Sequence, residues 1–493
     1  MRWTLAGTLV ALAVSGCTAG PDYHVPTHAI ANAPDAKGAF VNGGSAAFAE
    51  VPLPDHWWRL YADTRLDLYV TQALAANTDL RAADANLRRA YAAVREARAA
   101  QTVGTSFQAG VADTKQAGID ALSIPGWSYT AAFSVSYPLD LAGGIRRSVE
   151  AAGADAEAVE AMRDQVRVTV AAAVARNYVA VCAANRSLVA ARHVVDIQSE
   201  TLQEIRRMFR GGRSTRFDVT RAEIAVNQSK ASIPPIIAGR QAALYALAAL
   251  MGRPVADYPR ELENCPVPPA LQQPLPIGDG AALIRRRSDV RAAERALAAA
   301  TASIGIETAQ LYPQVSIGGS LGYAAPFPLS TIHSPESFGG HVGPLLSWSF
   351  PNLAVVHARI AEAGAAAQAA DARFDGAVLT ALQQTETALD AYVREMDRNR
   401  ELRRARDSAA DATSQARTLL RFGRTGVLDV LNVEASLAAT ETALAASDAA
   451  IADAQVNVFL ALGGGWSPET PSTPAHRAHN HQASFSRRAR TAG

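Results

Sequence analysis

Apolar and polar residues alternate with a period of two in four short segments of the chain. In the first half the alternation covers about residues 105–114 and 128–140, and in the second half about 314–323 and 340–350. Alternation over about ten residues is typical of strands with one apolar face. The pattern therefore predicts four β-strands, arranged as two pairs.

The remaining pattern is that of Ala-rich helices with charged residues around much of their circumference. The longest run extends from about Arg147 to Phe209, and at 1.5 Å per residue it would span on the order of 90 Å. It is too long for a compact domain and, by its charges, too polar for a transmembrane helix. The Pro234-Pro235 pair must break or kink the helix that returns alongside it.

These elements occur twice in the same order, and from Ser136 onward the matches keep a nearly constant offset of about 211 residues. The first structural repeat is expected over residues 57–252 and the second over 281–466, with a Pro-rich linker at 253–280. Each repeat reads as helix, two strands, long helix, a sharp reversal and a returning helix. The chain is thus predicted to be an internal duplication.

The reversals at residues 210–223 and 421–434 match one another closely, and each predicts the tip of a helical hairpin. Glycine permits the positive φ that ends a helix. The Thr215 hydroxyl, followed three residues later by a carboxylate, resembles a capping box that starts the next helix. The aligned pairs are Gly212 with Gly423, Arg213 with Arg424, and Asp218 with Asp429.

The N-terminus resembles the signal of a bacterial lipoprotein. Arg2 precedes an apolar run, and small residues lead to Cys17, so residues 1–16 are predicted as a signal peptide and Cys17 as the acylated first residue. The alternative is an ordinary signal with a chance cysteine. Thr18 suggests sorting to the outer membrane. Residues 17–56 are rich in Gly, Pro and Ala and predict an extended, lipid-anchored tether.

Residues 467–493 have no apolar periodicity and are predicted to be a disordered tail. Weak metal binding by its three histidines is the alternative to a simply solvated tail; they are His476, His479 and His481. Cys182 and Cys265 could form a disulfide in an oxidising compartment. The favoured interpretation is instead that Cys182 is a small buried packing residue.

Composition and motifs argue against several classes of function. With 47 basic and 46 acidic residues the net charge is +1, which indicates no general affinity for nucleic acid. The sequence contains no phosphate-binding glycine loop, metalloprotease motif or nucleophile elbow, so it predicts neither an enzyme nor a resident metal or other cofactor. Energy for any active transport must therefore come from a partner.

The strands carry the main functional inference. Four strands cannot close a membrane barrel, which starts at about eight, and open sheet edges are not tolerated in lipid. The chain must therefore associate, and three copies would supply twelve strands. The alternative is a soluble sandwich. Four aromatic residues near the strand ends suit the interfaces of a bilayer; they are Tyr129, Tyr137, Tyr323 and Trp348.

Several short stretches together resemble the outer-membrane efflux proteins, in particular the lipoprotein branch of the TolC-like channels. The resemblance covers nearly the whole chain except its tail. The matching stretches are Cys17 with the following Gly20-Pro21-Asp22-Tyr23 and Pro26, then Trp57-Trp58, residues 66–80, Tyr137 to Leu141, Arg146 to Ala152, both tips, and Ala461 to Trp466.

The resemblance implies an α+β membrane protein of TolC-like fold, in which three chains form a twelve-stranded barrel and a long periplasmic helical barrel. It implies a covalent lipid on Cys17 (N-palmitoyl, S-diacylglycerol) and insertion among outer-membrane lipids. It further implies a periplasmic adaptor that docks at Gly212, Arg213, Gly423 and Arg424. It also implies an inner-membrane pump, which we expect to be of the resistance-nodulation-division type.

In the family, acidic residues at the positions of Asp218 and Asp429 belong to the periplasmic gate. The other interpretation of both is a helix-start role, and the two are compatible. Some members carry a gating arginine where this chain has Thr425. The expected function is passive export of small molecules, with protein secretion or metal efflux as alternatives in the same fold. A structural, periplasm-spanning coiled coil is the alternative from another class.

Overall fold

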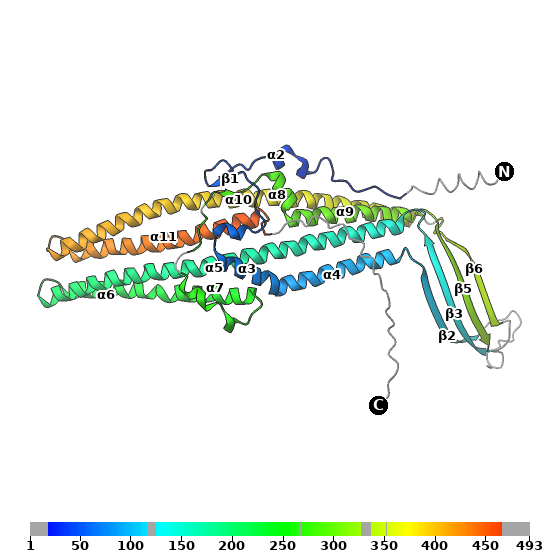
Figure 1. Ribbon diagram of the computed structural model, residues 1–493, viewed down its shortest axis with the longest axis horizontal. Helices are drawn as coiled ribbons and strands as arrows, with labels where there is room; N and C mark the ends of the chain where they lie inside the picture. The colour runs from blue at the N-terminus through cyan, green and yellow to red at the C-terminus, as the bar shows by residue number, and fades with distance from the viewer. Residues whose placement is uncertain are drawn as a thin grey trace, which may run out of the picture.

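The computed structural model describes residues 18–115, 125–265, 268–271, 273–326, 337–351 and 353–465. The molecule is elongated, with a β-sheet at one end and two helical hairpin tips at the other (Figure 1). The cysteine predicted to carry lipid and the histidines of the tail lie outside the described residues, as do the predicted signal and tail.

Two long helices run from the sheet to the tips. They are α5 (Gly144–Arg210), with 67 residues, and α10 (Leu353–Arg421), with 69 residues. Each therefore extends about 100 Å. The first returns as α6 (Arg216–Ala231) and α7 (Ile233–Leu250), and the second as the single helix α11 (Val427–Ala461). The predicted break at Pro234-Pro235 is confirmed, since α7 begins immediately before this pair.

The half of the molecule nearer the sheet also contains shorter helices. Asn77 divides the single helical run predicted before the strands, because it ends α3 (Thr64–Ala76) and its side chain caps α4 (Thr78–Ala99). Its Oδ1 accepts hydrogen bonds from the amides of Asp79 and Leu80. The second repeat has α8 (Gly280–Arg286) and α9 (Ser288–Ala309) in the corresponding places.

The four predicted strands form one antiparallel sheet in the order β2-β3-β5-β6. The last strand ends three residues before its predicted end, because its Ser347 already pairs with Gln314, the first residue of β5. Strands β3 and β5 join the two repeats in the middle of the sheet. The strands are β2 (Gly104–Lys115), β3 (Pro125–Leu139), β5 (Gln314–Pro326) and β6 (Phe338–Ser347).

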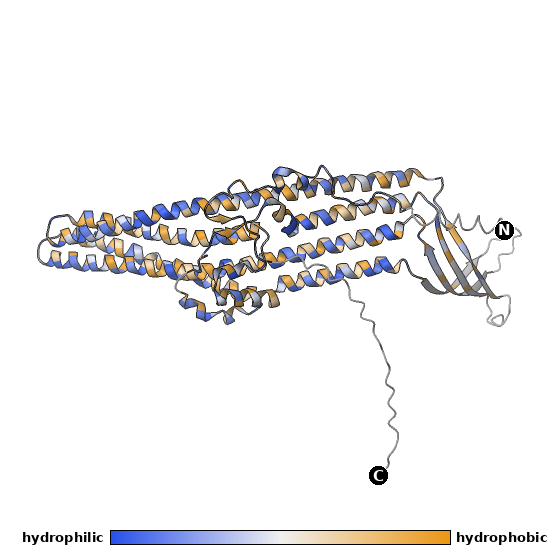
Figure 2. Ribbon diagram, turned by 45° about the horizontal axis from the view of Figure 1, so that its top comes forward, coloured by the Kyte–Doolittle hydropathy of each residue, from blue (hydrophilic) through white to orange (hydrophobic). Residues whose placement is uncertain are grey.

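The two faces of the sheet differ as the alternation predicts. Phe107, Phe133 and Leu321 lie in register across three strands and present one apolar face. The next position along each strand is Ser134 and Ser320, and Ser320 Oγ lies 3.1 Å from His341 Nδ1. One face is therefore suited to lipid and the other to water. Figure 2 shows hydrophobic residues spaced along the strands, and hydrophobic and hydrophilic residues mixed around the long helices.

The principal core lies midway along the molecule, where both repeats meet. The indole ring of Trp57 stacks on the Phe459 ring at 4.5 Å between centroids. An apolar, 18-residue stretch of α5 would suffice in length and composition to cross a membrane, and 61% of it is buried inside the protein. A second such stretch lies within Arg216–Leu250 and is 22% buried. This one stretch of α5 is more apolar than the charges of the whole helix indicate, and it packs mainly against this core.

Residues 18–56, named here the N-terminal strap, differ from the extended tether predicted for them. Within the strap, α2 (Pro34–Lys37) packs against α8, and β1 (Phe48–Ala49) pairs in parallel with β4 (Leu275–Pro276) of the linker. Its buried side chains include Phe40, Phe48 and Leu53. Scattered apolar residues in a Gly- and Pro-rich segment thus fix the strap along the helices, although the segment has no helical or strand periodicity.

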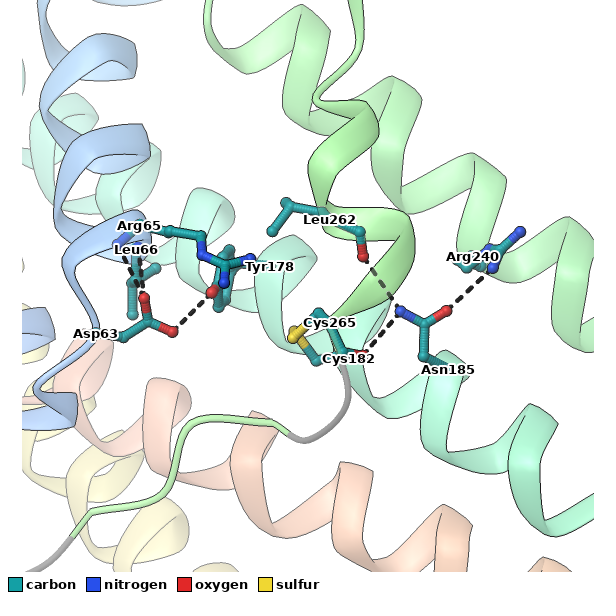
Figure 3. The surroundings of a disulfide bond; sticks show 9 residues. All are labelled: Asp63, Arg65, Leu66, Tyr178, Cys182, Asn185, Arg240, Leu262 and Cys265. Atoms are coloured by element: carbon teal, nitrogen blue, oxygen red, sulfur yellow. Dashed lines mark hydrogen bonds between the residues drawn. A yellow bond between two sulfur atoms is a disulfide. The ribbon is translucent and has the colours of Figure 1, made fainter.

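The two cysteines form a disulfide, Cys182–Cys265, so the preference for Cys182 as a mere packing residue was wrong (Figure 3). Its burial was predicted correctly. Asn185, one turn along α5, donates hydrogen bonds from Nδ2 to the carbonyls of Leu262 and Cys265, at 3.2 and 3.0 Å. These bonds hold a turn of the linker against α5, which brings together two cysteines 83 residues apart in sequence.

Candidate functional site: hairpin tips and membrane junction

Both long helices end in the same way at the tips. Gly212 has φ of +71° and Gly423 has φ of +67°, which an L-residue rarely adopts. The Arg213 amide donates to the Met208 carbonyl at 2.8 Å, and the Arg424 amide donates to the Leu419 carbonyl at 2.9 Å. These bonds back over the helix end are those of a Schellman cap. The prediction of a helix stop at each glycine is confirmed.

The first returning helix begins at a capping box, as predicted. The Asp218 amide donates to Thr215 Oγ1 at 3.2 Å, and Asp218 Oδ2 accepts from the Thr215 amide at 2.9 Å. The same oxygen accepts from the hydroxyls of Thr215 and Ser214 at 2.7 and 3.0 Å. The Thr215 amide and hydroxyl lower the pKa of the Asp218 carboxyl, because they stabilise its ionised form.

The second returning helix repeats this arrangement without a hydroxyl at the cap position. Asp429 Oδ2 accepts from the Gly426 amide at 3.2 Å and from Thr425 Oγ1 at 2.9 Å. Thr425, which stands where some family members carry an arginine, therefore contacts the acidic residue of its own tip. The capping role predicted for Asp218 and Asp429 is confirmed, and their role in a gate stays a prediction.

The two tips lie side by side. A Cβ at Gly423 would lie 3.7 Å from Arg213 Nη2, across the two hairpins. A small cluster of buried residues from all four helices, including Ile205, Val219 and Val430, joins them beneath. At the surface, Phe217 and Phe422 are 66% and 74% exposed. The tips thus present backbone, guanidinium groups and uncovered aromatic rings, and docking of an adaptor there stays a prediction.

A buried carboxyl lies just behind the tips. Glu434 on α11 is 2% exposed and accepts a hydrogen bond from the Thr201 hydroxyl of α5. Arg417 of α10 approaches it at 3.9 Å, although that guanidinium also pairs with Glu200 at 2.6 Å. Burial raises the pKa of Glu434 to about 7. Its counterpart Glu223 differs, since it is near the surface and pairs with Arg206.

At the other end of the molecule, the strap begins where the strands meet the long helix. The Ala19 amide donates to the Ala142 carbonyl at 2.9 Å, and Thr18 packs against Gly143. The Arg147 side chain is 3% exposed; its Nη2 lies 2.7 Å from Asp22, and its Nε donates to the Ala19 carbonyl at 3.1 Å. The sequence points to Arg147 only as the approximate start of the long helix and as part of a resemblance, and its partners in the strap could not be predicted from spacing.

The chain matches the family model described as outer membrane efflux protein over residues 69–253 and 281–464, once in each repeat. The chain belongs to this family. It is 28% identical to Nodulation protein T of Rhizobium leguminosarum bv. trifolii, over 95% of this chain and 99% of that one. It is 27% identical to Outer membrane protein OprJ of Pseudomonas aeruginosa, over 96% and 98%.

Among solved structures, the chain is similar to the outer-membrane channel OprN, with 32% identity and a TM-score of 0.84 over 92% of this chain and all of that one. As a member of the outer membrane efflux protein family, the chain has a TolC-like fold and is an outer-membrane channel component of an efflux system. The family is that of a channel rather than an enzyme. Within the described residues, no cluster of three or more His, Cys, Asp or Glu could hold a metal.

Proposed function

We propose that three copies of this chain form the outer-membrane channel of a tripartite exporter. The observation that supports this most is the sheet, which ends the elongated bundle and has its edge strands β2 and β6 paired on one side only. A sheet with open edges is not stable in lipid. Three copies, pairing β2 of one with β6 of the next, would close a barrel of twelve strands.

The proposed conduit continues through the long helices into the periplasm. The polar face of the sheet, which carries Ser134, Ser320 and His341, would line its outer part. The hairpin tips lie about 100 Å away, at the far end of α5 and α10. There Asp218 and Asp429 would form acidic rings that govern leak. Gly212, Arg213, Gly423 and Arg424 would meet the periplasmic adaptor.

The cargo proposed for the conduit is small molecules. Relatives of the chain have names that refer to export of pyoverdine, and to efflux of antibiotics and toluene, in Pseudomonas species. A channel by itself has no energy source, so the proposal includes an adaptor and an inner-membrane pump of the resistance-nodulation-division type. Passage through the conduit is passive, and the pump selects the molecules that are exported.

The chain is further proposed to carry lipid on Cys17, as N-palmitoyl and S-diacylglycerol groups. In support, Thr18 packs against Gly143, at the point where β3 passes into α5. This junction is where the surface of the membrane should lie if the sheet spans it. Acyl chains on the preceding residue could therefore enter the bilayer beside the barrel.

The test is to purify the full-length protein in detergent, compare its migration before and after heating, and record single-channel currents in a planar bilayer. We expect a band of three chains that heating converts to one, and discrete unitary currents. A single-chain species without currents would contradict the channel and favour a periplasmic strut.

A further inference from the structure

A basic groove of about 660 Å³ lies between α4 and α5, on the helical side of the sheet. Three arginines of α4 line it, at Arg88, Arg95 and Arg98. Their spacing of seven and three residues places them along one face of the helix. Gly153 of α5 leaves the opposite side open, since a Cβ there would meet nothing within 4 Å.

The groove has a surplus of positive charge. Within the part of the chain that the structure describes, no carboxylate pairs with any of the three arginines. The one acidic residue in the lining, Glu157, lies 3.2 Å from Arg295 Nη1 outside the groove. Tyr91, between the arginines, donates its hydroxyl to Glu160 at 3.1 Å. Three exposed guanidinium groups are thus free to bind an anion.

One residue of the groove lining, Glu157, is linked to the N-terminal strap through Arg295 of α9. Arg295, the partner of Glu157, lies over the Tyr23 ring of the strap, with its guanidinium carbon 5.5 Å from the ring centroid. The strap begins at Thr18, at the junction of the sheet with α5. A segment that ends in a lipid anchor must run on the outer surface of the proposed channel. The link from Glu157 through Arg295 to Tyr23 is the basis for placing the groove on this outer surface as well.

The groove also lies at the level of the membrane surface. Arg98 is one residue before the end of α4, and β2 begins at Gly104. Arg88 lies about 15 Å further from the sheet, at 1.5 Å per residue. The cationic side chains therefore begin where the strands end, at the depth that lipid headgroups occupy in a bilayer.

An apolar surface continues from the groove onto the sheet. Three residues beyond Arg98, Gln101 lines a second groove of about 400 Å³ together with Tyr137. Tyr137 also lines a third groove, of about 450 Å³, whose mostly apolar lining includes Val103 and Phe133. Cationic, amphipathic and apolar surfaces thus follow one another in the order of a phospholipid's phosphate, glycerol and acyl chains.

We propose that this groove binds the phosphate headgroup of an anionic phospholipid, with its acyl chains against the apolar face of the sheet. The lipid is phosphatidylglycerol or a related anionic lipid of the periplasmic leaflet. Guanidinium groups form paired hydrogen bonds to phosphate oxygens, and basic clusters beside a membrane-spanning segment favour anionic headgroups. The proposal rests on the proposed function in two respects, since the sheet must lie in a membrane and the lipid-anchored strap must run on the outside of the channel.

The experiment compares lipids retained by the purified full-length protein after exchange into an equimolar mixture of phosphatidylglycerol and phosphatidylcholine, counted by native mass spectrometry. We expect the wild type to prefer phosphatidylglycerol. The triple variant R88Q/R95Q/R98Q should lose this preference, by roughly fivefold for each arginine removed. The lysine variant R88K/R95K/R98K keeps the charge and should retain more of the preference than the glutamine variant.

The matched control removes three arginines of α10 whose side chains are 59–70% exposed and lie outside the groove, as R394Q/R400Q/R404Q. It should retain phosphatidylglycerol as the wild type does. Equal preference in R88Q/R95Q/R98Q and wild type would overturn the proposal. So would displacement of the lipid by inorganic phosphate, which would indicate a site for soluble anions.

Loss of the trimer in R88Q/R95Q/R98Q would also overturn the proposal, because it would place the three arginines between copies of the chain. Planar-bilayer currents of the same preparations separate this test from that of the channel. Selective retention of phosphatidylglycerol by a protein that does not conduct would support the groove and contradict the channel. Conduction by a protein with no lipid preference would support the channel and contradict the groove.

Discussion

Glu434 shows how the two repeats diverge at single residues. It occupies the position of Glu223 in the second repeat, but it is buried between three helices while Glu223 pairs with Arg206 near the surface. Its Oε1 accepts from Thr201, and its Oε2 has no hydrogen-bond partner among the described residues. A buried carboxylate without full hydrogen bonding is costly, so the neutral acid is favoured here.

This burial predicts a pH-dependent stability. The pKa of Glu434 is about 7 in the folded chain, against 4.5 for the free side chain. Between these values the folded state holds a proton that the unfolded state releases, so stability falls as pH rises through this window. The full loss, on the order of 3 kcal/mol, is reached above pH about 7. Thermal unfolding followed by helical circular dichroism between pH about 5 and about 8 measures it.

In that experiment Glu434→Gln should raise the unfolding temperature at the upper end of the range and flatten its dependence on pH. Glu223→Gln is the matched control, since it changes the corresponding residue at an accessible site, and its pH dependence should follow the wild type. A Glu434→Gln variant with the wild-type dependence would show that another group titrates.

The disulfide predicts a second effect at single residues. Closing a loop of 83 residues restricts the unfolded chain, and removing such a bond typically costs about 2–5 kcal/mol. Cys182→Ser should therefore unfold at lower temperature than the wild type. Adding reductant should lower the unfolding temperature of the wild type toward that of the variant. The unfolding temperature of Cys182→Ser should not change. Equal stability of both proteins without reductant would mean that the bond does not stabilise the principal core.

At the scale of elements, each tip is a helix stop followed by a capped start, and both parts were predictable from sequence. Gly212 and Thr215 act through their immediate neighbours, so local spacing carries the information. The strands were predictable for a similar reason, because one apolar face imposes strict alternation. The fold of the strap was not predictable from sequence, since its few apolar residues, such as Phe40, pack against helices that are distant in sequence.

The tips allow capping and gating to be separated. We expect Asp218→Ala with Asp429→Ala to raise single-channel conductance, because it removes both acidic rings and loosens each helix start by removing the N3 carboxylate of its capping box. Asp218→Asn with Asp429→Asn removes the charge and keeps a side chain that can cap. If charge governs the leak, both double variants conduct more than wild type. Wild-type conductance and ion selectivity in both would contradict a gating role.

At the scale of the whole molecule, the sequence predicted the duplication because one offset aligns distant stretches such as Gly212 with Gly423. It predicted association because four strands are too few to close a barrel. It did not predict the meeting of Cys182 with Cys265, or of Arg147 with Asp22. Those contacts depend on how the strap and linker fold over the helices. The local periodicity of the sequence does not predict that arrangement.

The most direct test of the trimeric channel is a cross-linking measurement across the open edges of the sheet. Thr105→Cys on β2 is combined, one at a time, with cysteine at positions 339–345 of β6, and the oxidised membranes are analysed by denaturing electrophoresis. A trimeric channel should have a register at which cross-linked dimers and trimers form and no species larger than three chains appears. A ladder that continues beyond three, or none at any register, would contradict it.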